Sequence, residues 1–130
     1  MKEINLIISG NTISSKNSKR IVYSHRQKRP MIISSEAYLK YRKKALPQLK
    51  KQKNKLKIIP EDKFCYIELT FYRKTRHKFD YNNLGQGILD LLQEADIIID
   101  DDMNHVIPIY KPWKLDKENP RTEIKIIYDN

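Results

Sequence analysis

Cysteine, glycine and long apolar runs are all scarce in this chain of 130 residues. A single cysteine, Cys65, excludes the internal disulfide framework that holds many small secreted domains together, and its alternating apolar surroundings indicate a packed side chain. No segment approaches the roughly 20 apolar residues of a membrane span. The start, MKEINLIISG, has too short an apolar run for a signal peptide. We therefore expect a cytoplasmic protein without a membrane partner.

The three glycines form no phosphate-binding loop of the type G-x-x-x-x-G-K-[ST]. No Ser/His/Asp or Cys/His pairing that would indicate nucleophilic catalysis stands out either. His25 and His77 both lie in basic segments, so we interpret them as surface residues. These absences leave no sign of a small-molecule cofactor.

Acidic residues are scarce in the first 79 residues, which hold 21 Lys and Arg against 5 Asp and Glu. The remaining residues reverse this balance with 5 against 11, and the whole chain has a net charge of +10. Nucleic acid is the partner that such a basic surface favours, because binding releases condensed counterions. Charge alone also fits ribosomal contacts, an anionic membrane surface or simple solubility.

Alternating apolar residues predict three strands, at residues 3–8, 64–72 and 122–128. A further strand is expected near His105–Ile109. Two apolar runs that flank a basic turn, at 21–23 and 31–33, predict a short hairpin or an extended arm. Together with two helices, these segments predict one compact α/β (α+β) domain over residues 1–130. Its small mixed sheet should have the strand at 64–72 in the centre.

The first helix is expected to begin after Ser34 or Ser35, either of which can cap it. Its apolar stripe recurs at helical spacing in Tyr38, Tyr41, Ala45 and Leu49. Pro47 should kink or end this helix, because proline lacks the amide donor that a helix interior needs. The lysine-rich residues 50–57 are therefore interpreted as an exposed loop or a frayed helix end.

The stretch from Lys78 to Asp102, KFDYNNLGQGILDLLQEADIIIDDD, concentrates acid in a basic protein. After Asp80 a second helix is predicted by one apolar stripe, made of Leu84, Ile88, Leu91, Leu92 and Ala95. Gly85 and Gly87 each cost about 1 kcal/mol relative to alanine in a helix, which suggests close approach of another backbone or a ligand. Ile97–Ile99 should form a short buried strand or extension that delivers Asp100–Asp102.

A hard divalent cation such as Mg²⁺ is one explanation for this acid. Asp80 and one of Asp100–Asp102 could supply oxygen ligands, with water and a substrate phosphate filling the remaining positions. Such an ion would lower the pKa of a bound water and neutralise charge on a phosphodiester. The same residue types also occupy turns and helix caps for purely local hydrogen bonds, so both interpretations stay open here.

Two basic segments could contact the phosphates of a nucleic acid. The first is the small, polar loop between Ser9 and Arg20, and the second is RKTRHK, which directly precedes Phe79 and Asp80. The candidate contact residues are Lys16, Asn17, Lys19, Arg20, Arg73, Lys74, Arg76 and Lys78. Phosphate contacts position a protein on DNA without reading its sequence. A solvated surface loop is the alternative for each segment.

Between Asp80 and Asp102 the sequence resembles the RusA family of Holliday junction resolvases, many of them carried by phages and prophages. The family pattern is an Asp, any residue, then Asp-Asn-Leu opening a helix. A Lys follows three residues after that Asn, an Asp four further on, and an Asp-Asp pair roughly ten beyond. This chain has D-Y-N-N-L, then Gln86, Asp90 and Asp100-Asp101. Other segments resemble the family too: SKN at Ser15–Asn17, the helix start at 35–41, and the closing NPRTEIKI.

The resemblance implies a homodimeric endonuclease that binds four-way DNA junctions and cuts them with aspartates that bind Mg²⁺, with Mn²⁺ as the alternative ion. By position, Asp80 and Asp101 fall on catalytic aspartates of the family, and Asp100 and Asp90 on aspartates common in its pattern. Asn82 stands where the second catalytic Asp is expected, and Gln86 where the catalytic Lys is expected. The implied catalytic set is Asp80, Asn82, Gln86 and Asp101, and the implied metal set is Asp80, Asn82, Asp100 and Asp101.

These two departures define the alternatives. Asn82 removes one negative charge, although its amide oxygen can still bind a metal, and Asp102 could compensate. Gln86 removes a cation that could steady the attacking water or the phosphate, and Lys78 or Arg76 could compensate. The leading hypothesis is a Mg²⁺-dependent junction endonuclease of DNA recombination and repair. The alternatives are a catalytically impaired junction-binding module of the same fold, and a basic RNA-binding protein.

Overall fold

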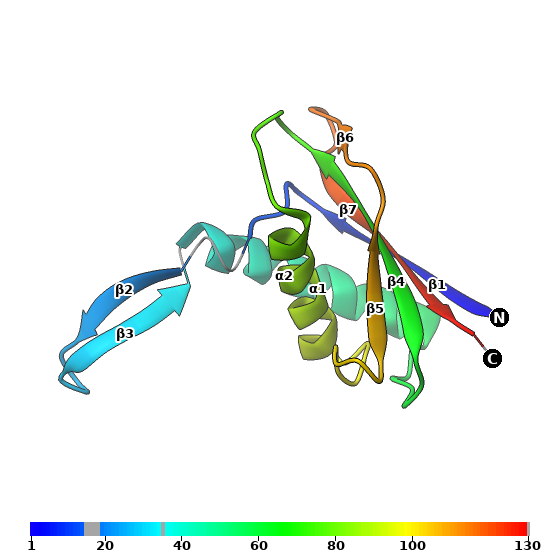
Figure 1. Ribbon diagram of the computed structural model, residues 1–130, viewed down its shortest axis with the longest axis horizontal. Coiled ribbons are helices and arrows are strands. Elements are labelled where there is room, and N and C mark those ends of the chain that lie inside the picture. The colour runs from blue at the N-terminus through cyan, green and yellow to red at the C-terminus, as the bar shows by residue number, and fades with distance from the viewer. Residues whose placement is uncertain (15–18, 35, 130) are drawn as a thin grey trace.

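A five-stranded mixed sheet with two helices packed on one face forms the body of the protein (Figure 1). The computed structural model describes residues 1–14, 19–34 and 36–129, and it leaves the side chains of residues 19–23 and 31–34 undescribed. Four strands follow one another across the sheet: β1 (Lys2–Ser9), β7 (Arg121–Tyr128), β4 (Cys65–Arg73) and β5 (Val106–Tyr110). The fifth, β6 (Lys114–Leu115), pairs with the end of β4. The predicted mixed sheet with two main helices is confirmed, and β4 lies inside the sheet as expected.

Strand directions explain how the chain returns across the sheet. β7 runs antiparallel to both β1 and β4, whereas β5 is parallel to β4. A parallel neighbour needs a crossover connection, and helix α2 (Tyr81–Glu94) supplies it. Of the strand or extension predicted at Ile97–Ile99, the strand is wrong, because the chain bends there. The predicted burial is confirmed for Ile97 and Ile98, whereas Ile99 is exposed.

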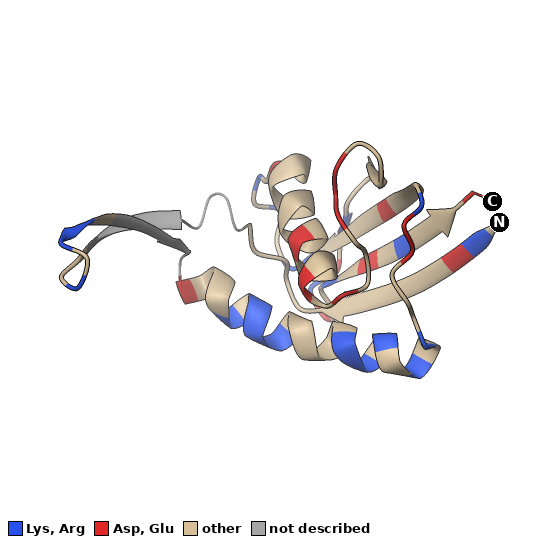
Figure 2. Cartoon of the chain, turned by 90° about the horizontal axis from the view of Figure 1, so that it is seen from below, with Lys and Arg blue, Asp and Glu red and all other residues tan. Residues whose placement is uncertain are grey.

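Helix α1 (Glu36–Leu56) runs straight through the position where the sequence predicts a kink or an end. Pro47 lies inside it, and the lysine-rich segment after it is helical to Leu56, so both the predicted end and the predicted loop are wrong. Because Pro47 is exposed, water can hydrogen-bond to the carbonyl that lacks a helical donor. Figure 2 shows basic bands along the whole of α1 and one acidic band at its start. Of the helices in the described part of the chain, none has the length and hydropathy of a membrane span.

Two glutamines of α1 bind the outer edge of β1. Gln52 accepts from the Ile7 amide at 2.9 Å and donates to the Ile7 carbonyl at 2.7 Å. Gln48 accepts from the Ser9 amide at 2.8 Å and donates to its carbonyl at 3.4 Å. An unpaired strand edge is a template for association with another chain. The two side-chain amides satisfy part of that edge, and they also fix the later turns of α1 against the sheet.

The predicted hairpin is confirmed in the backbone as β2 (Lys19–Ser24) and β3 (Arg29–Ser34), an antiparallel pair that forms its own two-stranded sheet. Its turn contains Lys28 with a positive φ of 54°. Figure 1 shows this hairpin extending away from the helices and the main sheet.

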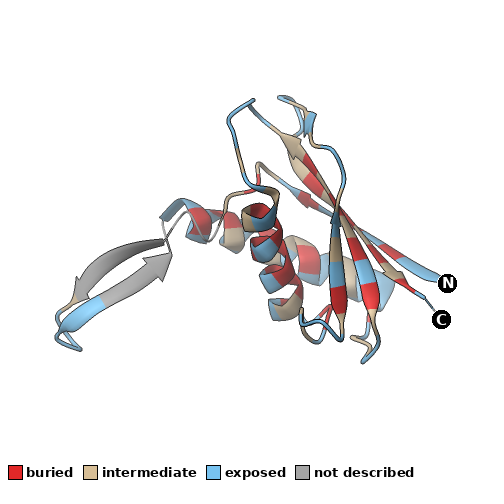
Figure 3. Ribbon diagram, in the orientation of Figure 1, coloured by how far each residue is buried: buried red, intermediate tan, exposed pale blue. Residues whose placement is uncertain are grey.

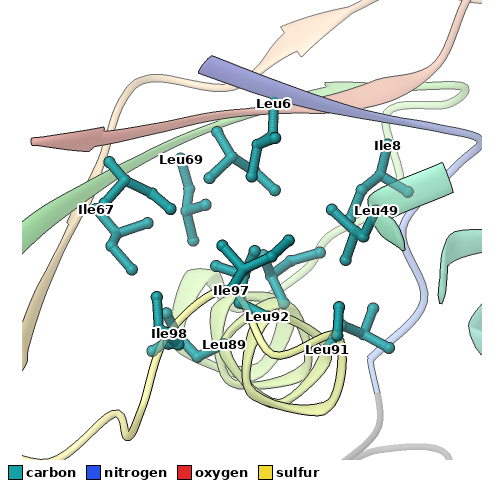
Figure 4. Close-up of a cluster of buried hydrophobic side chains, with 14 of the residues drawn as sticks. Leu6, Ile8, Leu49, Ile67, Leu69, Leu89, Leu91, Leu92, Ile97 and Ile98 are labelled. Carbon is teal, nitrogen blue, oxygen red and sulfur yellow. The ribbon is translucent and has the colours of Figure 1, made fainter. Parts of the chain in front are cut away.

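The hydrophobic core lies between the sheet and the two helices. Buried and more exposed residues alternate along β1, β4 and β7, as Figure 3 shows. The helix-facing side chains of the sheet include Leu6, Ile8, Ile67 and Leu69, and they meet those of α1, α2 and the turn after α2 (Figure 4). Cys65 is buried in this core, and burial raises the pKa of its thiol to about 11. The predicted packing of Cys65 as a small hydrophobic residue is confirmed.

Candidate active site

Asp80 is the N-cap of α2. Its φ of −102° and ψ of 125° are extended, and its Oδ1 accepts from the amides of Asn82 at 2.8 Å and Asn83 at 3.4 Å. A capping side chain of this kind satisfies amides that have no partner inside the helix. Both hydrogen bonds end on Oδ1, so they orient the exposed carboxylate while Oδ2 accepts from neither amide. The local interpretation of Asp80 as a cap is therefore correct, and Oδ2 takes no part in the two capping hydrogen bonds.

Gln86 joins the helix to the acidic segment that follows it. Its Nε2 donates to Asp90 Oδ1 and to Asp101 Oδ2, both at 3.1 Å. A primary amide carries two hydrogens, so one can serve each carboxylate. The structure thus brings Gln86, Asp90 and Asp101 together, and it holds Asp80 and Asn82 nearer the start of the same helix. Asp80 directly precedes α2, and Asp101 lies in the segment between α2 and β5.

The other two aspartates of the triplet have separate partners. Asp100 Oδ1 accepts from the amide of Asp101 at 2.7 Å and from Gln93 Nε2 at 3.4 Å. Asp102 faces His105, whose Nδ1 lies 2.6 Å from Asp102 Oδ1. The hydrogen bond to His105 lowers the pKa of Asp102, and the same contact is the main cause that raises the pKa of His105. Asp102 is therefore paired with His105, and a metal ion would have to compete with His105 for this carboxylate.

Close packing at the start of α2 explains one of its two glycines. A Cβ at Gly85 would overlap Tyr110, lying 2.5 Å from Cε1 and 2.7 Å from Cζ. The close approach expected at Gly85 is real, but the neighbour is a tyrosine ring of β5 and not a backbone. Burial raises the pKa of Tyr110, and the negative charge of Asp80 adds to the shift. The ring of Tyr110 therefore lies within the electrostatic reach of Asp80.

A small basic hollow lies beside Asp80. It has a volume of about 170 Å³, and its walls include Arg73, Lys78, Asp80 and Asn83 together with Thr12, Ile13, Ser14, Phe79 and Leu84. Arg73 donates to the carbonyl of Thr12 and lies over the ring of Phe79 at 5.1 Å. Burial lowers the pKa of Arg73. Of the predicted phosphate-contacting residues, Arg73 and Lys78 thus lie next to Asp80.

The remaining predicted DNA contacts lie in the turn after β4, in β2, or outside the described residues. Lys74 is exposed, and its amide donates to Asn11 Oδ1 at 2.9 Å. Arg76 is exposed in the same turn. Lys16 and Asn17 lie outside the described residues, and Lys19 and Arg20 are described only as backbone of β2.

An aromatic cluster beside Asp80 is absent from the sequence predictions. Phe79 packs edge-on against Tyr81, with ring centroids 5.1 Å apart, and against Trp113 at 6.1 Å. Tyr81 also accepts a hydrogen bond from the Trp113 amide at 3.0 Å. Trp113 comes 32 residues after Tyr81, so no local pattern links them. In the sequence, this cluster is indicated only by the position of Phe79, Tyr81 and Trp113 near lysines and arginines.

The oxygen donors of this region suit a hard cation in kind. Within the described residues, no group of three or more His, Cys, Asp or Glu side chains could hold a metal by itself. Mg²⁺ does not require one, since it is commonly bound by one or two carboxylates with water and substrate phosphate as the other ligands. Asp80, Asn82, Asp100 and Asp101 offer such carboxylate and amide oxygens. By donor type, these side chains suit an ion that completes its coordination with water and a bound phosphodiester.

Comparison with models of known protein families gives a match. A family model described as "Endodeoxyribonuclease RusA" matches residues 13–127, which is most of the chain. No curated protein matches the sequence significantly. The matched region contains all the catalytic, metal-binding and DNA-contacting residues that the sequence predicts.

Proposed function

The chain belongs to the RusA endodeoxyribonuclease family, and from that premise we propose that it is a Mg²⁺-dependent endonuclease that cuts four-way DNA junctions during recombination and repair. Membership implies nuclease activity on branched DNA, and nucleases of this family generally depend on a divalent metal. One observation carries the proposal for this chain. Asp101, which follows a buried turn, is held by Gln86 against the helix that Asp80 caps.

In this proposal Asp80 and Asp101 are the catalytic carboxylates. The amides of Asn82 and Asn83 fix the orientation of Asp80, and Gln86 fixes Asp101. Side chains that are held before the substrate arrives lose little entropy on binding it. Asn82 lies in the first turn of α2 and can offer its amide oxygen where a carboxylate would otherwise stand.

Asp80 and Asp101, assisted by Asn82 and Asp100, are the residues that would hold the metal. When bound, a divalent ion supplies an activated water and neutralises charge on the phosphate. The protein's own contribution is that hydrogen bonds fix both Asp80 and Asp101, and that Asp80 lines the same hollow as Arg73 and Lys78. Acid beside base suits a substrate that is itself a polyanion, because the cations attract the DNA that the carboxylates alone would repel.

The basic residues would hold the arms of the junction by their phosphates. Lys78 and Arg73 lie at the site, Lys74 and Arg76 lie in the adjoining turn, and Lys16, Asn17, Lys19 and Arg20 stay predictions from sequence. α1 adds a row of exposed lysines: Lys40, Lys43, Lys44, Lys50, Lys51 and Lys55. Such contacts make affinity fall steeply with salt without reading base sequence. We further propose a homodimer, because cutting two strands related by a two-fold axis needs two sites.

Cleavage of a synthetic four-way junction in Mg²⁺ tests the proposal. Asp101→Asn should abolish cutting while junction binding survives, because the neutral amide keeps the size of the side chain but removes the charge of a metal ligand. Asp96→Asn is a matched control, since Asp96 is an exposed aspartate at the end of the same helix. Its positive φ of 58° suits asparagine equally well. Equal cleavage by Asp101→Asn and the unaltered chain would sink the assignment.

A second candidate function is junction binding without cutting. Gln86 favours it, because a neutral amide satisfies Asp90 and Asp101 by hydrogen bonds but gives them no positive charge. This candidate predicts tight, salt-sensitive junction binding with no cleavage in Mg²⁺ or Mn²⁺. The double variant Asn82→Asp/Gln86→Lys should then gain cleavage. Efficient cutting by the unaltered chain rules this candidate out.

A further inference from the structure

A second hollow, with a volume of about 280 Å³, adjoins the one that contains Asp80. It is lined by Arg76, His77, Lys78, Phe79, Tyr81 and Trp113. We call it the aromatic hollow. Lys78 and Phe79 line both hollows, so the two hollows share part of a wall. The residue that directly follows Phe79 is Asp80.

The walls of the aromatic hollow combine the two features that bind single nucleotides. Phe79, Tyr81 and Trp113 offer aromatic surface, and Arg76 and Lys78 offer positive charge. Proteins hold unpaired DNA by stacking bases on aromatic rings while cations bind the backbone, and this works for any base because every base has a π-face. A paired base inside a duplex cannot enter such a hollow without being unstacked.

The cluster is held in place before any ligand arrives. Phe79 contacts Tyr81 and Trp113 edge-on, at interplanar angles of 73° and 85°. Trp113 is tied to Tyr81 by the hydrogen bond from its amide, and the guanidinium of Arg73 covers Phe79. The side chains that line the hollow are therefore positioned by α2, by the turn after β4 and by the connection after β5.

We propose that the aromatic hollow binds a nucleobase next to the crossover of a branched DNA strand, stacked with Trp113, while the adjoining phosphate lies at Asp80. This inference rests on the proposed function, and it adds the part of the substrate that distinguishes a branch point from a plain duplex. Bases that already lack a continuous stacking neighbour cost least to extrude. The hollow would thus favour branched over continuous DNA without reading sequence.

Trp113 is the only tryptophan of the chain, so its fluorescence reports on the hollow directly. Titration in EDTA with a four-way junction of synthetic oligonucleotides should quench that emission. A continuous duplex, or a junction with abasic sites beside the crossover, should quench it clearly less. Trp113→Leu should weaken junction binding by about 5- to 150-fold, the range produced by losing one base–aromatic stack, and Trp113→Phe should restore most of the affinity.

Tyr66→Leu is the matched control. Tyr66 is an exposed aromatic residue on β4, on the face of the sheet that points away from the helices, and its replacement should leave binding unchanged. Equal quenching by junction, duplex and abasic junction would overturn the inference, as would unchanged affinity in Trp113→Leu. If the chain binds and cuts the junction but the fluorescence of Trp113 does not change, only the proposed stacking of a base on Trp113 is refuted. A chain that binds no junction refutes both this inference and the proposed function.

Discussion

Replacing Gly85 by alanine should destabilise the protein, against the usual effect of this substitution in a helix. Alanine is favoured over glycine by about 1 kcal/mol in a helix interior. At position 85, however, the added methyl group would overlap Tyr110 Oη and lie 2.5 Å from Cε1. Real carbon atoms do not approach so closely, so the tyrosine ring must move or α2 must shift away from β5.

The ring of Tyr110 has little freedom to move. It stacks on Phe71 with centroids 6.4 Å apart, and it packs against Tyr81 at 5.6 Å. Overpacking of this kind costs about 1–3 kcal/mol. After subtracting the gain in helix propensity, we expect the free energy of unfolding to fall by about 1 kcal/mol, which lowers Tm by about 3–6 °C in a domain of this size.

A double-mutant cycle with Tyr110→Leu isolates the clash. Urea unfolding should show that Gly85→Ala is destabilising in the unaltered chain but neutral or stabilising when the ring is absent. Gly10→Ala is the control: Gly10 has a φ of 109° and no atom near an added Cβ, so its cost is backbone strain and should not depend on Tyr110. The reasoning fails if Gly85→Ala is as stable as the unaltered chain, or costs the same in both backgrounds.

Three further predictions concern other parts of the molecule. Gln52→Ala removes two hydrogen bonds to Ile7, so it should cost about 1–3 kcal/mol and speed hydrogen exchange of the Ile7 amide; unchanged exchange would contradict this. The pKa of His105 is raised by its pairing first with Asp102 and then with Asp62. This pairing therefore stabilises the fold below pH 6.5 and is lost as pH rises through the higher folded pKa. His105→Gln should flatten that dependence in unfolding measurements from pH 5 to 9. Lys78→Ala should weaken junction binding and reduce the slope of log K against log salt by about 1, and an unchanged slope would remove Lys78 from the phosphate contacts.

Much of the fold could be predicted from the spacing at which apolar residues recur in the sequence. β4, β7 and α2 each bury one face, so their apolar residues recur at the period of a strand or a helix. That period predicted the correct type of element in all three cases. The end of α1 could not be predicted this way. Within α1, Leu49 is the only buried residue after Pro47. The glutamines that bind these turns to β1 are polar, so they add nothing to the apolar periodicity from which a helix is predicted.

The site was predictable in its residues but not in its contacts. Asp80 could be identified as a cap because capping is local in sequence. The pairing of Gln86 with Asp101 spans 15 residues, and it depends on the turn after α2, where Asp96 takes a positive φ. The packing of Trp113 beside Phe79 depends on the return of the chain from β5, which no pattern near either residue encodes.

The most direct test of the proposed activity is the fate of one labelled four-way junction incubated with the unaltered chain in Mg²⁺, against the same mixture in EDTA. We predict paired nicks near the crossover in Mg²⁺ and an intact, bound junction in EDTA. A junction that stays bound and intact in both Mg²⁺ and Mn²⁺ would contradict the assignment. In that case Asn82 and Gln86 have left a binding protein in place of a nuclease.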